Sequence, residues 1–311
     1  MAKTKFCLGI SDISDSYDGM IIDLEGVLHD GRNVFDGVID CLKELRKRHK
    51  YIIFLTNSQD LSADIEKKLK GMGLRSNLYD VCLTNAQFLH EKLKDRDEGP
   101  FEGIGSKCYL YAKDTPEYLK HIDIRIVEDI KQADFIMMHD FDLSMQKMEE
   151  VDKTLRKAVQ RRLPAYCINP DSATLVSGNL LIGANMIALK YQDFGGVVHN
   201  IGKPHKIIFD HCKRVLQGQG IYPGDTVVIG DTMAHDVVGG AFVNIDTALV
   251  KTGLHKAAFK RADNPAETDR ILNIMISQNN SVRPTYLIDK FQWGNPLPDR
   301  KHRKRAQPKQ T

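Results

Sequence analysis

The feature of this sequence that most constrains its fold is a repeated alternation of short apolar runs with longer amphipathic stretches. The runs at 19–23 and 51–55 have the length and composition of buried strands. Between them, residues 36–47 place apolar side chains on one face of a helix. Strands that alternate with helices in this way predict an α/β protein built on a largely parallel sheet.

The same pattern continues along the chain and predicts further strands and helices. Strands are expected at 108–111, 135–138, 165–168, 226–229, 247–250 and 286–288. Helices are expected at 62–70, 85–94, 144–162, 204–217 and 265–277, with one more after Asp236. The elements from 108 to 168 form a run of their own, and a chain of 311 residues is long enough for two domains.

Composition excludes several classes of protein. With 42% hydrophobic and 27% charged residues, the chain is typical of a globular protein and not of a collagen-like, low-complexity or mostly disordered one. No apolar run approaches the roughly 18–20 residues of a membrane-spanning helix. Asp12, Asp15 and Asp18 interrupt the stretch in which a signal peptide would be apolar. We therefore expect a cytoplasmic protein with no membrane partner.

The basic charge of the chain is concentrated at its C-terminus. Residues 300–311 hold six of the 44 Lys and Arg residues and no acid, so the net charge of +3 comes from this segment. A basic run can contact nucleic acid or an anionic membrane, but it is more often a solvated tail. The rest of the chain has no basic stripe with interleaved aromatic residues. We predict that 299–311 is a disordered tail and that nucleic acid is not a partner.

The cysteines do not form a metal or redox motif. No CxxC pair occurs among them, which excludes a local zinc ribbon or a thioredoxin-type site. Because a chain of this length can form a core without disulfides, we expect buried, reduced thiols. They are Cys7, Cys41, Cys82, Cys108, Cys167 and Cys212.

Polar residues suited to catalysis or ligand binding follow four of the predicted strands. Ligands of open α/β sheets bind at the carboxyl ends of the strands. Asp23 follows the first strand and precedes a Gly26 turn, a position suited to metal binding or to nucleophilic attack on phosphorus. Taken alone, an Asp at a strand end is more often a turn or cap residue. The hydroxyl and free N–H groups of 56–58 are suited to phosphate oxygens, or they form a helix N-cap.

Two more such places lie in the second half of the chain. Lys203, just before a predicted helix, is a compact cation suited to a phosphoryl group, although one exposed lysine by itself indicates nothing. Asp231 and Asp236 lie five positions apart at a strand-to-helix turn and are suited to a divalent cation. This pair is the most specific of the four signals.

In chain order the four motifs are Asp-x-Glu, Thr-Asn, Lys and Gly-Asp-x₄-Asp. This order resembles that of the haloacid dehalogenase (HAD) superfamily, whose motifs are DxDx[TV], a hydroxyl residue, a lysine and GDxxxxD. The segments 54–58, 167–171, 201–204 and 228–231 resemble its subclass IIA, NagD-like branch, over roughly residues 18–255. The resemblance implies a Rossmann-like core with a parallel sheet and an inserted, smaller α/β cap of the C2 type.

The resemblance also implies a division of the chain. Residues 1–83 and 197–298 would form the core and residues 84–196 the cap, which covers the phosphate site and selects the leaving group. Asn169 and Asp171 would contact the substrate from the cap, or they form a simple Asn-Pro-Asp turn. Dimers formed through the cap are familiar in this branch, so a homodimer is expected.

The resemblance further implies a phosphoaspartyl mechanism. Asp23 would attack phosphorus, while Thr56, Asn57 and Lys203 would hold the phosphoryl oxygens. Catalysis of phosphoryl transfer is mostly positioning and charge neutralisation, which fits this set.

A Mg²⁺ cofactor belongs to the same implied mechanism. The ion would be held by the Asp23 carboxylate, the Glu25 backbone carbonyl and Asp231, with Asp236 steadying a metal-bound water or the lysine. Mg²⁺ prefers few carboxylates and several waters, in agreement with this small ligand set.

Glu25 departs from the family pattern, in which the second acid of the first motif is Asp and acts as the proton donor and then the base. Its carboxylate reaches about 1.5 Å further, and a misplacement near 1 Å can cost roughly 10²-fold in rate. Three outcomes are open: a working acid/base, a slow hydrolase, or a transferase-like site. His29 lies near the first motif in the sequence and His235 lies within the last one. Either these histidines share the proton work, or they support the site from outside it or lie at the surface.

Competing functions are weaker. A dinucleotide-binding GxGxxG is incomplete, because Cys108 stands where Gly103-x-Gly105 needs its third glycine, and Pro204 excludes a P-loop. The remaining alternative is a catalytically impaired HAD-like protein that binds phosphorylated ligands, and Glu25 favours it. We predict a Mg²⁺-dependent phosphatase of a small phosphorylated metabolite, with a sugar phosphate as one candidate.

Overall fold

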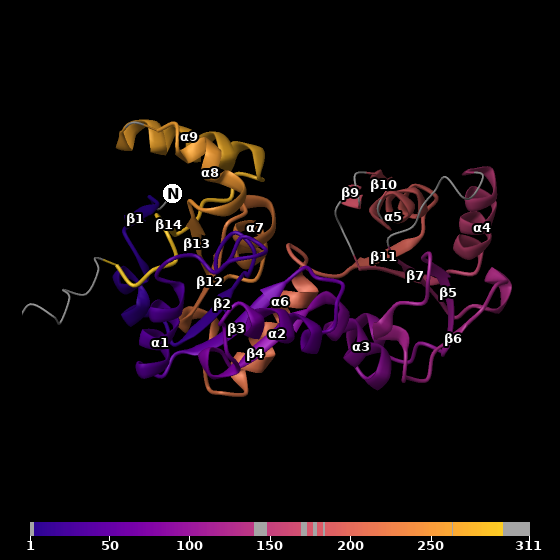
Figure 1. The fold of residues 1–311 in the computed structure, drawn as a ribbon. Coiled ribbons are helices and arrows are strands. Elements are labelled where there is room, and N and C mark those ends of the chain that lie inside the picture. Colours follow the sequence, from indigo (N-terminus) through magenta and orange to yellow (C-terminus); the bar gives the residue numbers. More distant parts are fainter. Residues whose placement is uncertain are drawn as a thin grey trace, which may run out of the picture.

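The computed structural model describes residues 3–139, 148–168, 173–176, 179–182, 184–262 and 264–294, and for the two short segments 173–176 and 179–182 it describes the backbone. Two lobes lie side by side, each built on a parallel sheet (Figure 1). The predicted α/β class with a parallel-sheet core and a second, smaller sheet is confirmed. The predicted tail at 299–311 and the predicted cap residues Asn169 and Asp171 lie outside the described residues.

The larger lobe contains a seven-stranded sheet in which every pair of neighbouring strands is parallel. Its order is β1 (Lys5–Cys7), β14 (Tyr286–Ile288), β13 (Asp246–Val250), β12 (Thr226–Gly230), β2 (Gly19–Ile22), β3 (Tyr51–Thr56) and β4 (Val81–Thr84). Its helices are α1 (Val38–Lys47), α2 (Ser62–Gly71), α6 (Lys206–Gln217), α7 (Val238–Phe242), α8 (Lys256–Phe259) and α9 (Pro265–Gln278).

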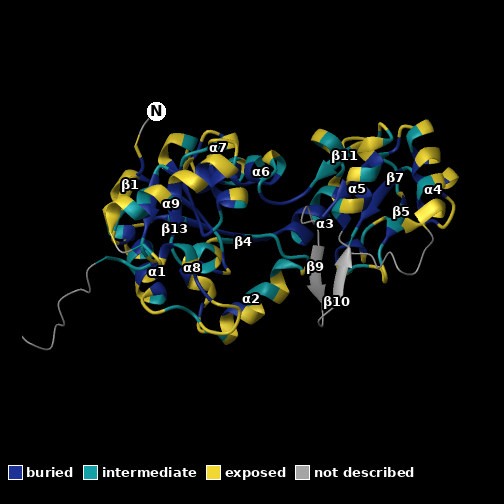
Figure 2. Ribbon diagram, turned by 90° about the horizontal axis from the view of Figure 1, so that it is seen from above, coloured by how far each residue is buried: buried dark blue, intermediate teal, exposed yellow. Residues whose placement is uncertain are grey.

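Helices cover both faces of this sheet, which explains why its strands are apolar at successive positions. Met20 and Ile22 pack into the cluster that holds the buried face of α1, whereas Ile21 packs with Phe209 of α6 on the other face. Buried residues accordingly line the strands while the outer helix faces are exposed (Figure 2).

The smaller lobe contains a five-stranded parallel sheet. Its order is β11 (Val197–Asn200), β8 (Pro164–Cys167), β7 (Phe135–Met138), β5 (Lys107–Tyr111) and β6 (Arg125–Ile126). It is accompanied by α3 (Asn85–Asp95), α4 (Met148–Gln160), α5 (Ala184–Asp193) and the antiparallel pair β9 (Ala173–Val176) and β10 (Asn179–Ile182).

Several details differ from the expectations. The strand at 197–200 pairs with β8 in the smaller sheet, whereas the sequence assigned the chain from 197 onward to the core. The helix expected from 204 begins at Lys206. Five of the cysteines are buried, but Cys7 is only partly buried, and all six are free. Over the described ranges, no helix is long and apolar enough to cross a membrane.

Candidate active site

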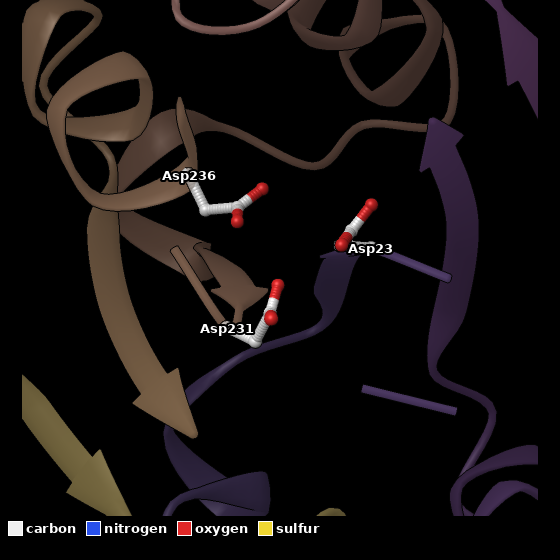
Figure 3. Close-up of side chains that lie close together, drawn as sticks. All are labelled: Asp23, Asp231 and Asp236. Atoms are coloured by element: carbon white, nitrogen blue, oxygen red, sulfur yellow. The ribbon is translucent and has the colours of Figure 1, made fainter. Parts of the chain in front are cut away.

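Three aspartates meet at the carboxyl edge of the larger sheet, where the strand order reverses between β2 and β12. Asp23 follows β2 and Asp231 follows β12, and the Asp23 N–H donates to the Ile229 carbonyl at 2.9 Å. Asp236 comes from a single π-helical turn, Met233–Val237. One carboxylate oxygen of each lies within 4.8 Å of the others, and the three side chains point toward one another (Figure 3).

Lys203 joins two of these carboxylates although it is distant in sequence. Its Nζ lies 2.6 Å from Oδ1 of Asp23 and 2.7 Å from Oδ1 of Asp236, and the residue is 4% exposed. Burial alone would lower the pKa of Lys203, but the two carboxylates raise it, so the ammonium stays charged. The sequence-predicted Lys203, Asp23 and Asp236 therefore form one contiguous ionic cluster.

The ionisation of Asp23 is set by opposing influences. Burial raises its pKa, Lys203 lowers it, and Asp236 and Asp231 raise it again, to about 7 in total. Burial also raises the pKa of Asp231. Three clustered carboxylates thus face one lysine cation, and the excess negative charge favours binding of a further cation.

Backbone groups hold Asp231 in place. Its Oδ2 accepts a hydrogen bond from the Leu254 N–H at 2.6 Å. A Cβ on Gly26 or on Gly253 would lie 2.3 Å or 2.0 Å from the same oxygen, and both glycines have positive φ. This close approach of two backbones to one carboxylate requires glycine at both positions.

Asp236 is held by its own turn. Its Oδ2 accepts hydrogen bonds from the backbone N–H of Thr232 at 3.1 Å and from the Thr232 hydroxyl at 2.6 Å. Oδ1 of Asp236 contacts Lys203. Asp236 was expected to steady either a metal-bound water or the lysine, and the structure places the lysine within hydrogen-bond distance.

Thr56 is the last residue of β3, Asn57 and Ser58 follow it, and all three line the same cavity. The Asn57 carboxamide is used within the protein: Oδ1 accepts from the Lys203 N–H at 2.8 Å and Nδ2 donates to the Lys203 carbonyl at 3.0 Å. The carboxamide of Asn57 is therefore engaged with Lys203, and the phosphate-binding role expected of Asn57 stays a prediction. Its backbone N–H is the group that a phosphate-binding role would use.

The cavity above the cluster has a volume of about 790 Å³. Glu25 lines it and is exposed, so its carboxylate stands apart from the three buried aspartates. His235 also lines it, whereas His29 is 8% exposed and its Nδ1 accepts from the Gly31 N–H. Burial lowers the pKa of His29.

Sequence reasoning missed further residues of this cavity. Asp30, Phe35, Thr232, Leu254 and Lys256 all line it. Thr232 lies inside the Gly-Asp-x₄-Asp motif, so its spacing was a usable signal. The loop at 253–256 follows β13, and its place at the carboxyl end of a strand was the signal available there.

Comparison with known proteins places these features in one family. The haloacid dehalogenase-like hydrolase model matches residues 20–124, and a HAD-hydrolase-like model matches residues 200–274. These ranges contain Asp23, Thr56, Lys203, Asp231 and Asp236. The chain belongs to the haloacid dehalogenase superfamily, in its subclass IIA branch.

Individual relatives are distant in sequence but match over most of their length. An acid sugar phosphatase of Staphylococcus haemolyticus is 23% identical over 85% of this chain and 97% of its own, and the sugar-phosphatase AraL of Bacillus subtilis is 25% identical over 79% and 88%. The solved p-nitrophenyl phosphatase of Archaeoglobus fulgidus has a TM-score of 0.65 at 23% identity, covering 88% of this chain and 97% of its own. That structural likeness confirms the fold.

Proposed function

We propose that this phosphoric monoester hydrolase removes phosphate from a small phosphorylated metabolite through an aspartyl-phosphate intermediate, with Mg²⁺ as its cofactor. The observation that carries the proposal is the position of Lys203, whose Nζ bridges Asp23 and Asp236 at 2.6 and 2.7 Å beside Asp231. A strand-end carboxylate that is oriented by a cation at the base of an open cavity is suited to in-line attack on phosphorus.

The donor set fits a hard divalent cation. Asp23 and Asp231 supply two carboxylates at the edge of the cavity, and the Glu25 backbone carbonyl belongs to the same turn. When bound, Mg²⁺ neutralises charge on the phosphoryl oxygens. The excess of carboxylates over lysine and the raised pKa of Asp23 support such an ion, because a nearby cation would keep the nucleophile ionised.

The residues of the chain then divide the work. One Oδ of Asp23 forms a bond to phosphorus as the bond between phosphorus and the leaving oxygen breaks. Thr56, the backbone N–H groups after it and Lys203 hold the phosphoryl oxygens during this transfer. Water then attacks phosphorus, which releases inorganic phosphate and regenerates the Asp23 carboxylate.

Glu25 is proposed to move the proton in both steps. It gives a proton to the leaving oxygen and then removes one from the attacking water, so that it returns to its starting state. Its exposed position on the cavity wall supports this role, since a proton carrier needs access to both the substrate and solvent.

The proposed substrate is a small phosphate ester, with a sugar phosphate as the first candidate. Two relatives carry the name sugar phosphatase, and a cavity of about 790 Å³ has room for a phosphoryl group and a compact leaving group. A homodimer formed through the smaller lobe is proposed on the family resemblance alone.

The test is phosphate release from a panel of phosphate esters, measured with Mg²⁺ and with EDTA, for the wild type and for Asp23→Asn. Mg²⁺-dependent release that Asp23→Asn abolishes, at an unchanged melting temperature, is the expected result. Activity of Asp23→Asn within tenfold of wild type contradicts the nucleophile assignment. If no phosphate is released and phosphorylated compounds still raise the melting temperature, the result favours a catalytically impaired protein that binds phosphorylated ligands.

A further inference from the structure

Asn85 lies between the two lobes and contacts the segments that connect them. It is the first residue of α3, directly after the core strand β4, and it is fully buried. Its Nδ2 lies 3.0 Å from the carbonyl oxygen of Ile168, which follows β8, and 3.5 Å from that of Ile201, which follows β11. One side chain of the outgoing connection thus contacts two strand ends of the smaller sheet.

The same Nδ2 also reaches the phosphate-binding loop, since it lies 3.4 Å from the Asn57 carbonyl oxygen. Asn57 in turn holds both the N–H and the carbonyl of Lys203, as described above. The contacts therefore run without interruption from the ends of β8 and β11, through Asn85 and Asn57, to the lysine that orients Asp23.

Gly202 shows how tightly these groups are packed. Its φ is +101°, and a Cβ built there would lie 2.3 Å from Asn85 Nδ2 and 2.7 Å from Asn57 Oδ1. The backbone before Lys203 is thus pressed against both carboxamides, and a side chain at Gly202 would force them apart.

Packing alone does not account for the choice of asparagine. Its Oδ1 is buried and has no hydrogen-bond partner among the described residues, and an unsatisfied buried acceptor destabilises the folded state. Because carbonyl oxygens only accept hydrogen bonds, Nδ2 of Asn85 must face the three carbonyls. Oδ1 of Asn85 is then left without a donor. A buried polar group that is retained at such a cost calls for a function.

We propose that Asn85 is a positioning residue for phosphoryl transfer. Its contacts fix the position of Lys203 and of the 56–58 loop relative to the ends of β8 and β11 in the smaller lobe. The expected effect of Asn85 on turnover rests on the proposed phosphatase function. The coupling between residue 85 and the 202–203 backbone is independent of that function.

Two readouts test the proposal on the full chain. Hydrogen exchange of backbone amides in Asn85→Ala should rise at least tenfold at 57–58 and 202–203 and stay unchanged in β12 and β13. The control is Phe88→Leu, a core change on the same helix at a residue that is 1% exposed. It should lower the melting temperature without this local increase.

Kinetics with p-nitrophenyl phosphate and Mg²⁺ give the second readout. Asn85→Ala should lower kcat at least tenfold with KM within threefold, while Phe88→Leu keeps kcat within twofold. If Asn85 acts through Asn57, the double variant Asn57→Ala/Asn85→Ala should lose no more than the worse single variant.

Three results would overturn the inference: no local increase in exchange, an increase with unchanged kcat, or multiplicative losses in the double variant. A wild type without turnover refutes the proposed function instead. In that case hydrogen exchange alone tests the role of Asn85. Faster exchange at 202–203 in Asn85→Ala supports the coupling between residue 85 and the 202–203 backbone, and unchanged exchange refutes it.

Discussion

Lys203 Nζ lies 2.6 Å from Asp23 Oδ1, although 180 positions separate the two residues in the chain. The contact exists because Asp23 directly follows β2, an interior strand of the larger sheet, while Lys203 enters from the segment that follows the smaller lobe. The second contact of the lysine, with Asp236, brings in the turn after β12. Three segments of the chain must therefore be assembled before the proposed nucleophile is oriented.

This cluster makes Lys203→Met a test of both stability and rate. The variant leaves Asp23 and Asp236 buried without their cation, which should lower the free energy of unfolding by about 3–5 kcal/mol at neutral pH. Turnover should fall by more than roughly 10²-fold, because phosphoryl charge loses its partner. Chemical denaturation and phosphate release measure the two effects, and Lys206→Met, at an exposed lysine three positions on, is the control.

The pH dependence of the same variant has a defined sign. The folded pKa of Asp23 is already raised to about 7 with Lys203 present, and removing the lysine raises it further. A carboxyl group with a raised folded pKa destabilises the fold as pH rises from its unfolded value, near 4, through the folded value. The deficit of Lys203→Met should therefore shrink below pH 6, and an equal deficit at pH 5 and pH 8 would contradict the charge explanation.

Glu25→Gln separates proton transfer from metal binding. Loss of a general acid/base should lower kcat roughly 10²-fold or more, while the Mg²⁺ dissociation constant stays within threefold because the proposed ligand is the backbone carbonyl. Asp30→Asn is the matched control, since Asp30 is another exposed acid of the same cavity and its backbone hydrogen bonds survive in Asn. If Glu25→Gln keeps full activity, another group moves the proton.

Asp231→Asn tests the proposed Mg²⁺ site without an activity assay. In the wild type, Mg²⁺ at tenfold above its dissociation constant should raise the free energy of unfolding by about 1.4 kcal/mol. The variant keeps an oxygen for the Leu254 N–H but lacks the charge, so this stabilisation should vanish. Asp225→Asn, at an exposed acid just before β12, should retain it. Equal stabilisation of all three proteins would place the ion elsewhere.

Most strands of the larger sheet and the cluster of aspartates could be predicted from the sequence because both follow local rules, whereas β1 and β4 were not predicted. Buried strands appear as apolar runs, and acids directly after them must gather at one edge of a parallel sheet. Asp23 and Asp231 meet for that reason, and Asp236 joins them from the turn after β12. Lys203 was identified through the order of the motifs, since its contact with Asp23 has no local signature.

The remainder depends on contacts that no local pattern encodes. β1 has three residues with exposed or partly buried side chains, so its parallel pairing with β14 has no periodic signal. Residues 197–200 were assigned to the core because the strand-helix pattern restarts at Val197, yet β11 pairs with β8 in the smaller sheet. Asn85 looked like an ordinary helix start, and its importance appears only where three distant carbonyl groups surround it.

His211 gives a prediction about stability away from the active site. It lies on α6, partly buried, with its ring edge-to-face against Phe88 at 5.3 Å. Burial lowers its pKa to about 4, with Lys92 and Arg214 adding to the effect and Glu98 opposing it. The folded protein therefore disfavours the imidazolium form.

The sign for His211 follows from linkage. A folded pKa of about 4, below the unfolded value near 6.5, means that the folded state binds fewer protons in this range, so stability falls as pH drops from 6.5 to 4. The loss from this residue should reach up to about 3 kcal/mol. Chemical denaturation of wild type and His211→Gln across this range isolates it from other groups, because those titrate in both proteins. The variant should show the shallower decline, and identical slopes would mean that His211 becomes charged in the folded state without cost.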